Sequence, residues 1–176
     1  MRIEGLGVGI RTFADQDVIG FQQLVLESAD YLSAIFPWCH SQYSVQESQD
    51  WVFSRQSAWD NGEEYSFLIY ECESQKLLGS IALNQINKPH RIANLGYWVG
   101  QSALGKGIAA KATKLISGYG FDELALSRIE IVTLPENLPS QRVAEKVGAK
   151  YEGVLQNRLL VKGVSVDACM YSLTNA

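Results

Sequence analysis

The chain has 176 residues, a net charge of −4 and a pI of about 5.2, and 47% of its residues are hydrophobic. Four Trp, eight Tyr and six Phe provide a packed core, which excludes a disordered chain, and the acidic balance argues against a direct nucleic-acid partner. No apolar run approaches the ~20 residues that span a bilayer, and the first residues lack the apolar stretch of a secretory signal. We therefore predict one domain, residues 1–176, with no membrane segment.

The elements can be predicted in chain order from hydrophobic spacing. An alternating stretch at residues 6–12 predicts a first strand, and apolar residues at helical spacing after Asp15 predict a helical zone, with a break, to Phe36. Ser44 followed by Glu47 has the spacing of a capping box and predicts a helix that ends near residue 59. Three strands with short connections then predict an antiparallel meander, at residues 65–72, 76–86 and 91–99.

The second half of the chain alternates helices and strands. An apolar face predicts a helix that starts near Gly107, and a β-branched run predicts a strand at residues 128–134. A short helix is predicted at about residues 139–147, with Gly148 as its left-handed stop. A final hairpin is predicted from residues 150–161 and 164–173.

The cysteine and histidine positions bear on metal binding and on the cellular compartment. Cys39, Cys72 and Cys169 are odd in number and far apart, and the two histidines, His40 and His90, are also far apart. This spacing lacks the paired ligands of a structural zinc site, so we predict no metal. Free thiols are typical of a reducing cytoplasm, which is the expected location.

The most informative segment is a strand that leads through a glycine-containing loop into a helix, at residues 97–109, YWVGQSALGKGIA. Gly105 and Gly107 allow the backbone to approach a phosphate closely, and the first N–H groups of a helix have no internal partner. Three lysines add positive charge: Lys106, Lys111 and Lys114. The segment predicts an anion site, although glycines that serve only the geometry of the turn explain the local pattern equally well.

This loop resembles motif A of the GCN5-related N-acetyltransferases (GNAT), in which a (Q/R)xxGx(G/A) sequence binds the pyrophosphate of acetyl-coenzyme A. Residues 136–153 are similar to the second signature of the ribosomal-protein (Rim-type) branch, which reads N-x-x-S, a short helix, K-x-G and then E-G. The ending at residues 167–173, DACMYSL, is also similar to that branch. The matches cover essentially the whole chain, and they are specific together although each is weak alone.

The resemblance implies a mixed α/β fold, with a mostly antiparallel sheet, a central splayed pair of parallel strands at residues 91–99 and 128–134, and helices on both faces. It implies an acetyl-CoA-dependent N-acetyltransferase that transfers the acetyl group to a primary amine directly, within a ternary complex. The expected acceptor is a protein N-terminal α-amine, and a homodimer is a candidate assembly.

The resemblance also assigns candidate site residues by position. The coenzyme loop comprises Leu104, Gly105, Lys106, Gly107, Ile108 and Ala109. The amide near Val99 would polarise the thioester carbonyl, Asn137 would contact the coenzyme, and Ser140 would assist departure of the thiolate. Trp38 and Tyr97 are the candidate residues on the acceptor side.

Several positions depart from the family pattern. The Q/R of motif A falls at Ser102, and Gln101 lies one place early. The tyrosine that many members use as a general acid is replaced by Ala144, and carboxylates used as bases in some members are replaced by Leu159 and Asn94. No catalytic base is visible at either place, which favours a weakly basic α-amine over a lysine side chain as the acceptor. A base from another part of the chain, such as His40 or Glu47, would restore lysine chemistry.

Local alternatives stay open for several of these residues. Ser140 and Asn137 have positions from which a side chain caps a short helix, and core packing explains Trp38 equally well. Gly96, inside a strand, predicts either a bulge or the avoidance of a clash. Three further aromatic residues are predicted to belong to the core: Trp51, Phe53 and Trp59.

Other functions also fit the sequence. A small-molecule amine or an antibiotic could be the acceptor, and the missing carboxylates are also compatible with a coenzyme A-binding module without catalysis. A protein-interaction domain that retains only the fold is a third reading. Binding of acetyl-CoA separates this third reading from the others, and turnover with amines separates an enzyme from a binding module.

Overall fold

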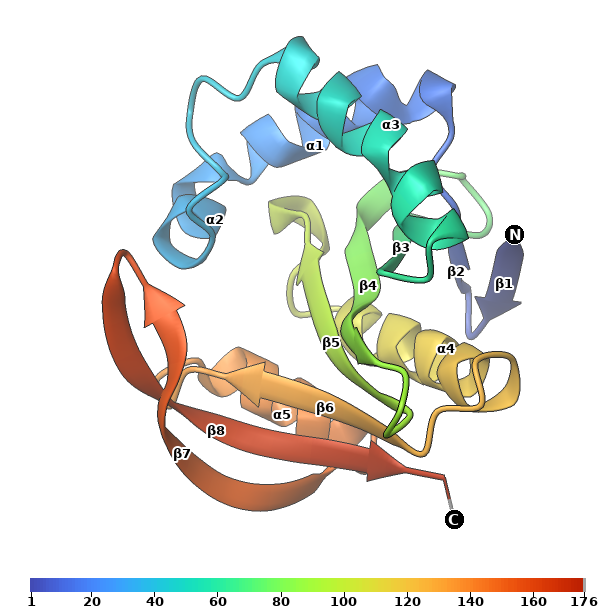
Figure 1. Ribbon diagram of the computed structural model, residues 1–176. Helices are drawn as coiled ribbons and strands as arrows, with labels where there is room; N and C mark the ends of the chain where they lie inside the picture. Colours follow the sequence, from blue (N-terminus) through green and yellow to red (C-terminus); the bar gives the residue numbers. More distant parts are fainter. Residues whose placement is uncertain (176) are drawn as a thin grey trace.

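The computed structural model describes residues 1–175 and contains one mixed sheet flanked by helices (Figure 1). The strands are β1 (Arg2–Gly5), β2 (Val8–Arg11), β3 (Tyr65–Glu71), β4 (Leu77–Asn87), β5 (Ile92–Val99), β6 (Arg128–Thr133), β7 (Lys150–Val161) and β8 (Val164–Thr174). The helices are α1 (Val18–Glu27), α2 (Ala29–Ile35), α3 (Val45–Asp60), α4 (Ile108–Asp122) and α5 (Leu138–Lys146), with 3₁₀ turns at Asp15–Asp17 and Gln101–Ala103. The predicted α/β class is confirmed.

The sheet contains one parallel pair of strands at its centre. The strand order is β1-β2-β3-β4-β5-β6-β8-β7, and every neighbouring pair is antiparallel except β5 and β6. The parallel pairing joins only Ile92–Asn94 to Arg128–Glu130, although β5 continues to Val99. Beyond Asn94 the two strands diverge, as Figure 1 shows, which confirms the predicted splay.

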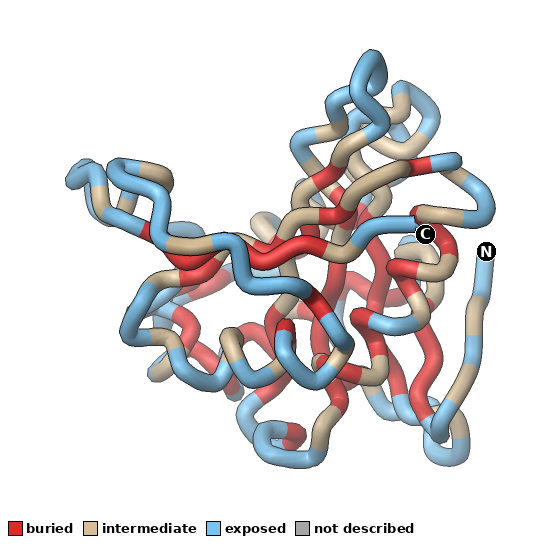
Figure 2. Tube along the Cα trace, turned by 90° about the horizontal axis from the view of Figure 1, so that it is seen from below, coloured by how far each residue is buried: buried red, intermediate tan, exposed pale blue. Residues whose placement is uncertain are grey.

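Helices cover both faces of the sheet. Phe67 of β3 belongs to an apolar cluster with Ile116 of α4, whereas the next residue, Leu68, belongs to a second cluster with Phe21 of α1. This alternation is the period of two that a strand buried on both faces requires. Figure 2 shows buried segments running through the centre of the molecule and exposed segments at its periphery.

The predicted helix ends are confirmed by local geometry. Ser44 Oγ accepts from the Glu47 N–H at 3.2 Å while the Glu47 carboxylate accepts from the Ser44 N–H at 2.8 Å, which completes the capping box of α3. The break in the first helical zone lies at Ser28, between α1 and α2. Gly148 follows α5 with a φ of 86°, which is the left-handed stop that the sequence indicates.

The strand predicted at residues 6–12 is found as β2, but the strand that precedes it, β1, was not predicted. Two short strands, β1 and β2, form a hairpin around Leu6 and Gly7, whose φ angles are 58° and 77°. A two-residue turn with positive φ at both positions suits a hairpin, but leucine is an unusual first residue for it. The turn therefore lacks the Asn-Gly or Gly-Gly signal that would separate the two strands in the sequence.

Two predictions about side chains and strand geometry are also corrected. Gly96 pairs regularly with Ala82, and the irregularity between β4 and β5 lies between Asn84 and Asn87, so Gly96 forms no bulge. A Cβ atom at Gly96 would meet only Asn84 Nδ2, at 3.7 Å, so no clash requires glycine there either. Trp59 packs against the core as predicted, but Phe53 is 49% exposed, because it lies on the outer side of α3.

Among residues 1–175, no helix is long and apolar enough to cross a bilayer. Within the same range, no group of three or more His, Cys, Asp or Glu side chains is arranged to hold a metal ion.

Candidate active site

Two cavities lie on either side of the splayed end of β5. One, of about 590 Å³, is enclosed by α2, β5, the loop before α4, and α5, and we call it the loop cavity. The other, of about 740 Å³, lies between α3, the segment after α2, and strands β4 and β5, and we call it the aromatic cavity. Phe36, Tyr97 and Trp98 line both, so the two cavities meet at the end of β5.

The loop cavity presents a run of free backbone donors. Gly105 and Gly107 have φ angles of 73° and 72°, in the left-handed region that glycine adopts most readily. Among the described residues, the N–H groups from Gly105 to Ala110 have no acceptor, and the first backbone bond of α4 runs from the Lys111 N–H to the Gly107 carbonyl. Unpaired donors at a helix N-terminus can bind an anion, which is the kind of site that the sequence analysis expects here.

Two cations from α5 add to this site. Arg142 and Lys146, one helical turn apart, both line the loop cavity, and a Cβ atom at Gly107 would lie 3.5 Å from Lys146 Nζ. Within residues 1–175 neither side chain forms an ion pair or a hydrogen bond. An ammonium group beside the positive end of a helix is electrostatically unfavourable until an anion lies between them, so this arrangement favours an anionic ligand.

The free edge of β5 borders the same cavity. The Gly100 N–H donates to the Leu78 carbonyl of β4 at 2.7 Å. Because successive residues of a strand direct their backbone groups to opposite edges, those of Val99 and Tyr97 point toward the side from which β6 has diverged. The Val99 carbonyl accepts a hydrogen bond there from the hydroxyl of Tyr31, on α2. An extended ligand with amide groups can pair with this edge.

A pair of hydroxyl groups lies near the junction of the cavities. Tyr97 Oη is 2.8 Å from Ser140 Oγ, and burial raises the pKa of Tyr97 to about 12. Asn137 caps α5, because its Oδ1 accepts from the Ser140 N–H at 3.2 Å. The capping alternative thus holds for Asn137 but not for Ser140, whose hydroxyl bonds to Tyr97.

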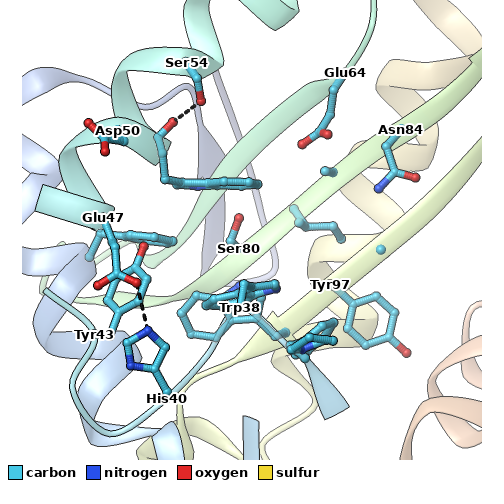
Figure 3. A pocket seen from close by; sticks show the side chains of 18 residues that line it. Trp38, His40, Tyr43, Glu47, Asp50, Ser54, Glu64, Ser80, Asn84 and Tyr97 are labelled. Carbon is cyan, nitrogen blue, oxygen red and sulfur yellow. Dashed lines mark hydrogen bonds and ion pairs between the residues drawn. The ribbon is translucent and has the colours of Figure 1, made fainter. Parts of the chain in front are cut away.

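Aromatic rings form most of the wall of the second cavity, as Figure 3 shows. Trp38 is 41% exposed and lies over the cavity, with its ring centroid 5.6 Å from that of Phe36 and 6.1 Å from that of Trp98. Core packing therefore does not account for Trp38. Trp51, which the sequence analysis placed in the core, also lines this cavity.

Three of the polar groups that line the aromatic cavity are carboxylates. Glu64 is paired with Arg55 at 2.8 Å, whereas Glu47 accepts hydrogen bonds from Ser44 and from His40 Nε2, the latter at 2.8 Å. The bonds from Ser44, supported by His40, lower the pKa of Glu47 to about 2, so this carboxylate is charged at neutral pH. Asp50 is the third carboxylate, and among the described residues no Lys or Arg lines the cavity.

Comparisons with known proteins identify the family. A family model described as an acetyltransferase (GNAT) domain matches residues 8–150. The chain belongs to the GNAT acetyltransferase family.

The relatives of this GNAT chain include several N-acetyltransferases. It is 34% identical over 134 residues to a Bacillus subtilis protein named probable N-acetyltransferase YjcK, covering 76% of this chain and 74% of that one. It is 32% identical over 95 residues to the spermidine N(1)-acetyltransferase of Escherichia coli strain K12, covering 54% of this chain and 50% of that one. The structure of RimL, a ribosomal L7/L12 α-N-protein acetyltransferase in complex with coenzyme A, superposes with a TM-score of 0.86 at 23% identity, covering 97% and 95% of the two chains. The protein is therefore an N-acetyltransferase with the GNAT fold.

The GNAT fold brings most of the sequence-predicted residues together. Around the loop cavity lie Val99, Leu104, Gly105, Gly107, Ile108, Ala109, Asn137 and Ser140, and Tyr97 lines both cavities. Trp38 lines only the aromatic cavity, and Lys106 is exposed and lines neither. Sequence reasoning missed Tyr31, Arg142 and Lys146. The spacing of Arg142 and Lys146 on the short helix after the N-x-x-S motif was an available signal, whereas nothing local marks Tyr31.

The positions at which some relatives carry a base hold no base here. Asn94 donates to Asn84 Oδ1 at 2.8 Å, and Leu159 pairs with Val166 between β7 and β8. Ala144 is fully buried and lines neither cavity. The described residues around the junction thus offer hydroxyl groups and backbone amides rather than a carboxylate.

Proposed function

We propose that the loop cavity binds acetyl-CoA and that the acetyl group passes directly to the α-amine of a protein N-terminus held in the aromatic cavity. The observation that carries the proposal is the junction at Tyr97 and Trp98, where a site for an anionic coenzyme meets a site with aromatic walls. The fold match to RimL, whose structure contains coenzyme A, supports the coenzyme, and RimL's action on a ribosomal protein supports the acceptor. Such an acceptor places the enzyme in the cytoplasm.

The chain's own groups suit each step of this transfer. The N–H groups from Gly105 to Ala110, with Lys146 and Arg142, bind the coenzyme phosphates. The free edge of β5 pairs with the amides of the pantetheine arm, and the Val99 N–H donates to the thioester carbonyl and stabilises its developing negative charge. The amine attacks from the aromatic cavity, and the Ser140 hydroxyl stabilises the sulfur as it leaves.

The lack of a carboxylate at two positions outside the cavities, Asn94 and Leu159, favours an acceptor that is neutral when it reacts. An α-amine with a pKa near 7.7–8.0 is about one-tenth neutral at pH 7, whereas a lysine amine near 10.4 is neutral about 250 times less often. An enzyme without a carboxylate at Asn94 and Leu159 serves the α-amine more readily, because water can carry its proton away.

A matched pair of peptides tests this preference. One peptide carries a free N-terminus and blocked lysines, and the other carries an acetylated N-terminus and a free lysine. With acetyl-CoA at pH 7, we expect mass spectrometry to show faster acetylation of the first peptide. Faster acetylation of the lysine peptide would refute the preference for α-amines.

A small polyamine is a second candidate acceptor. The observation that favours it is the set of cavity carboxylates, because Glu47 and Asp50 have no Lys or Arg partner among the described residues and can attract a second cationic group. The spermidine N(1)-acetyltransferase of Escherichia coli, which matches 54% of this chain, supports this alternative. Spermidine in the same assay separates the two acceptors: the polyamine hypothesis predicts a higher kcat/KM for spermidine than for the peptide with a free N-terminus.

A further inference from the structure

We propose that Tyr97 is a positioning residue for Ser140, and that its phenol directs the serine hydroxyl toward the sulfur of the leaving thiolate. This inference rests on the proposed function, because it assigns a task within acetyl transfer from acetyl-CoA. It concerns one contact, the hydrogen bond between the two hydroxyl groups at the meeting point of the cavities.

The hydrogen bond is specific in its geometry. Tyr97 Oη lies 2.8 Å from Ser140 Oγ and 3.3 Å from the Ser140 backbone carbonyl. Among the described residues, Ser140 Oγ has no other partner, because the Asn137 cap binds the Ser140 N–H and leaves the hydroxyl free. Figure 3 shows the Tyr97 hydroxyl directed away from the other labelled side chains of the aromatic cavity.

The direction of this bond follows from the chemistry of the two groups. Burial keeps the phenol protonated at neutral pH, since its pKa is raised to about 12. A protonated phenol is a better donor than an aliphatic alcohol, and Ser140 Oγ lies closer to Tyr97 Oη than the Ser140 carbonyl does, at 2.8 Å against 3.3 Å, so we assign the phenol hydrogen to Ser140 Oγ. The hydroxyl hydrogen of Ser140 then takes no part in the bond to Tyr97. It is free to point into the loop cavity, which Ser140 lines.

The consequence for the reaction can be written with its charges balanced. When the tetrahedral intermediate collapses, the C–S bond breaks and its electron pair moves to sulfur. The Ser140 O–H donates a hydrogen bond to this developing thiolate, and neither Ser140 nor Tyr97 gives up its proton. The proton released by the amine passes to water, and the products are the acetylated amine and the coenzyme A thiolate, which takes up a proton according to the pH.

A second feature points to Tyr97 as the source of this support. β5 holds Tyr97 through regular pairing with Ile81 of β4, so the phenol projects from a rigid strand rather than from a loop. Ser140 lies in the first turn of α5, and the bond between the hydroxyls joins the two elements across the cavity junction. Without the phenol oxygen, no hydrogen bond would fix the Ser140 side-chain rotamer or the direction of its hydroxyl hydrogen.

The test is a double-mutant cycle on kcat with acetyl-CoA and a peptide amine. Tyr97→Phe removes one oxygen, and we expect kcat to fall about fivefold to tenfold while the KM for acetyl-CoA changes less than about twofold. Because Tyr97 acts through Ser140, the double variant with Ser140→Ala should be no slower than Ser140→Ala alone. Tyr151→Phe, an exposed tyrosine outside both cavities, is the matched control and should retain the wild-type kcat.

Two results would overturn the inference. One is a wild-type kcat in Tyr97→Phe, and the other is a double variant whose loss equals the product of the two single losses. The thermal unfolding midpoint is measured for each variant. The kinetic measurements are then made at a temperature below the lowest of these midpoints, so that unfolding of a variant is not mistaken for a loss of kcat. If the wild-type protein transfers no acetyl group from acetyl-CoA, the proposed function fails, whereas normal wild-type turnover with an unaffected Tyr97→Phe rejects only the role of Tyr97.

Discussion

The loop cavity and the aromatic cavity are built in different ways. The loop cavity offers backbone groups to a ligand, namely the N–H groups of one contiguous segment from Gly105 to Ala110 and the free edge of β5. The aromatic cavity is made from side chains that come from separate parts of the chain, as Trp38, Trp51 and Trp98 illustrate. Under the proposed function, the coenzyme would contact mainly backbone groups, whereas the acceptor would contact side chains that can change one at a time.

The junction of the two cavities is formed by residues from both kinds of surroundings. Tyr97 comes from β5, which both cavities share, and Ser140 comes from the first turn of α5. Substitutions in the three regions should therefore affect different kinetic constants: coenzyme affinity at the loop, kcat at the junction and acceptor KM at the aromatic wall.

The largest expected effect is at the junction. Ser140→Ala should lower kcat about tenfold to a thousandfold, as for the loss of one donor to a developing charge, while acetyl-CoA affinity changes little. Steady-state kinetics and calorimetry measure the two constants. Ser33→Ala, which removes an exposed hydroxyl of α2 outside both cavities, is the control. A weakened affinity with an unchanged kcat would move Ser140 into the coenzyme site and break the division between the regions.

The next effect is at the loop. Gly107→Val should weaken acetyl-CoA binding about tenfold to a hundredfold, because a β-branched residue resists the left-handed φ of 72° and its side chain enters the phosphate site near Lys146. Calorimetry on the folded variant measures the affinity. Gly163→Val carries similar backbone strain, with a φ of 80°, but lies in the turn between β7 and β8. This control should lose stability and keep its affinity, and equal losses of affinity in both variants would contradict the assignment.

The smallest effect is electrostatic. Lys146→Gln should weaken acetyl-CoA binding about threefold to tenfold at low salt, and the difference from wild type should shrink at high salt because an exposed charge is screened. Lys150→Gln, which removes an exposed charge close by in the chain but outside both cavities, should bind normally. A loss of acetyl-CoA affinity that does not depend on salt, or an equal loss of affinity in both variants, would show that the ammonium of Lys146 does not contact the phosphates.

The same contrast explains which parts of the site could be predicted from the sequence. The geometry of the loop before α4 was predictable because its glycines, its free N–H groups and the following helix lie within a few residues of one another. Ser140 was singled out through the N-x-x-S spacing, but its contact with Tyr97 could not be predicted, because 43 residues separate the two and only the fold brings them together. Tyr31 was missed for the same reason, since its partner Val99 lies 68 residues away.

The fold was predictable where local signals agree and failed where they conflict. Alternation and capping residues located the strands of the meander and the start of α3. Strand β1 and its hairpin with β2 were missed because Leu6 occupies a turn position with positive φ that glycine or asparagine usually takes. Phe53 was wrongly assigned to the core because an aromatic residue on a helix does not reveal whether its face meets the sheet, a cavity or solvent. Trp51 packs against the core as predicted and also lines the aromatic cavity.

An NMR titration of ¹⁵N-labelled protein with acetyl-CoA tests the division between the two cavities most directly, because one spectrum contains both the backbone amides and the tryptophan indole N–H groups. The account predicts that the amides of residues 105–110 shift as acetyl-CoA is added, and that the indole signals of Trp38 and Trp51 stay in place until an acceptor amine follows. If acetyl-CoA alone shifts the indole signals while the amide signals of residues 105–110 stay unchanged, the coenzyme binds in the aromatic cavity and the account is contradicted.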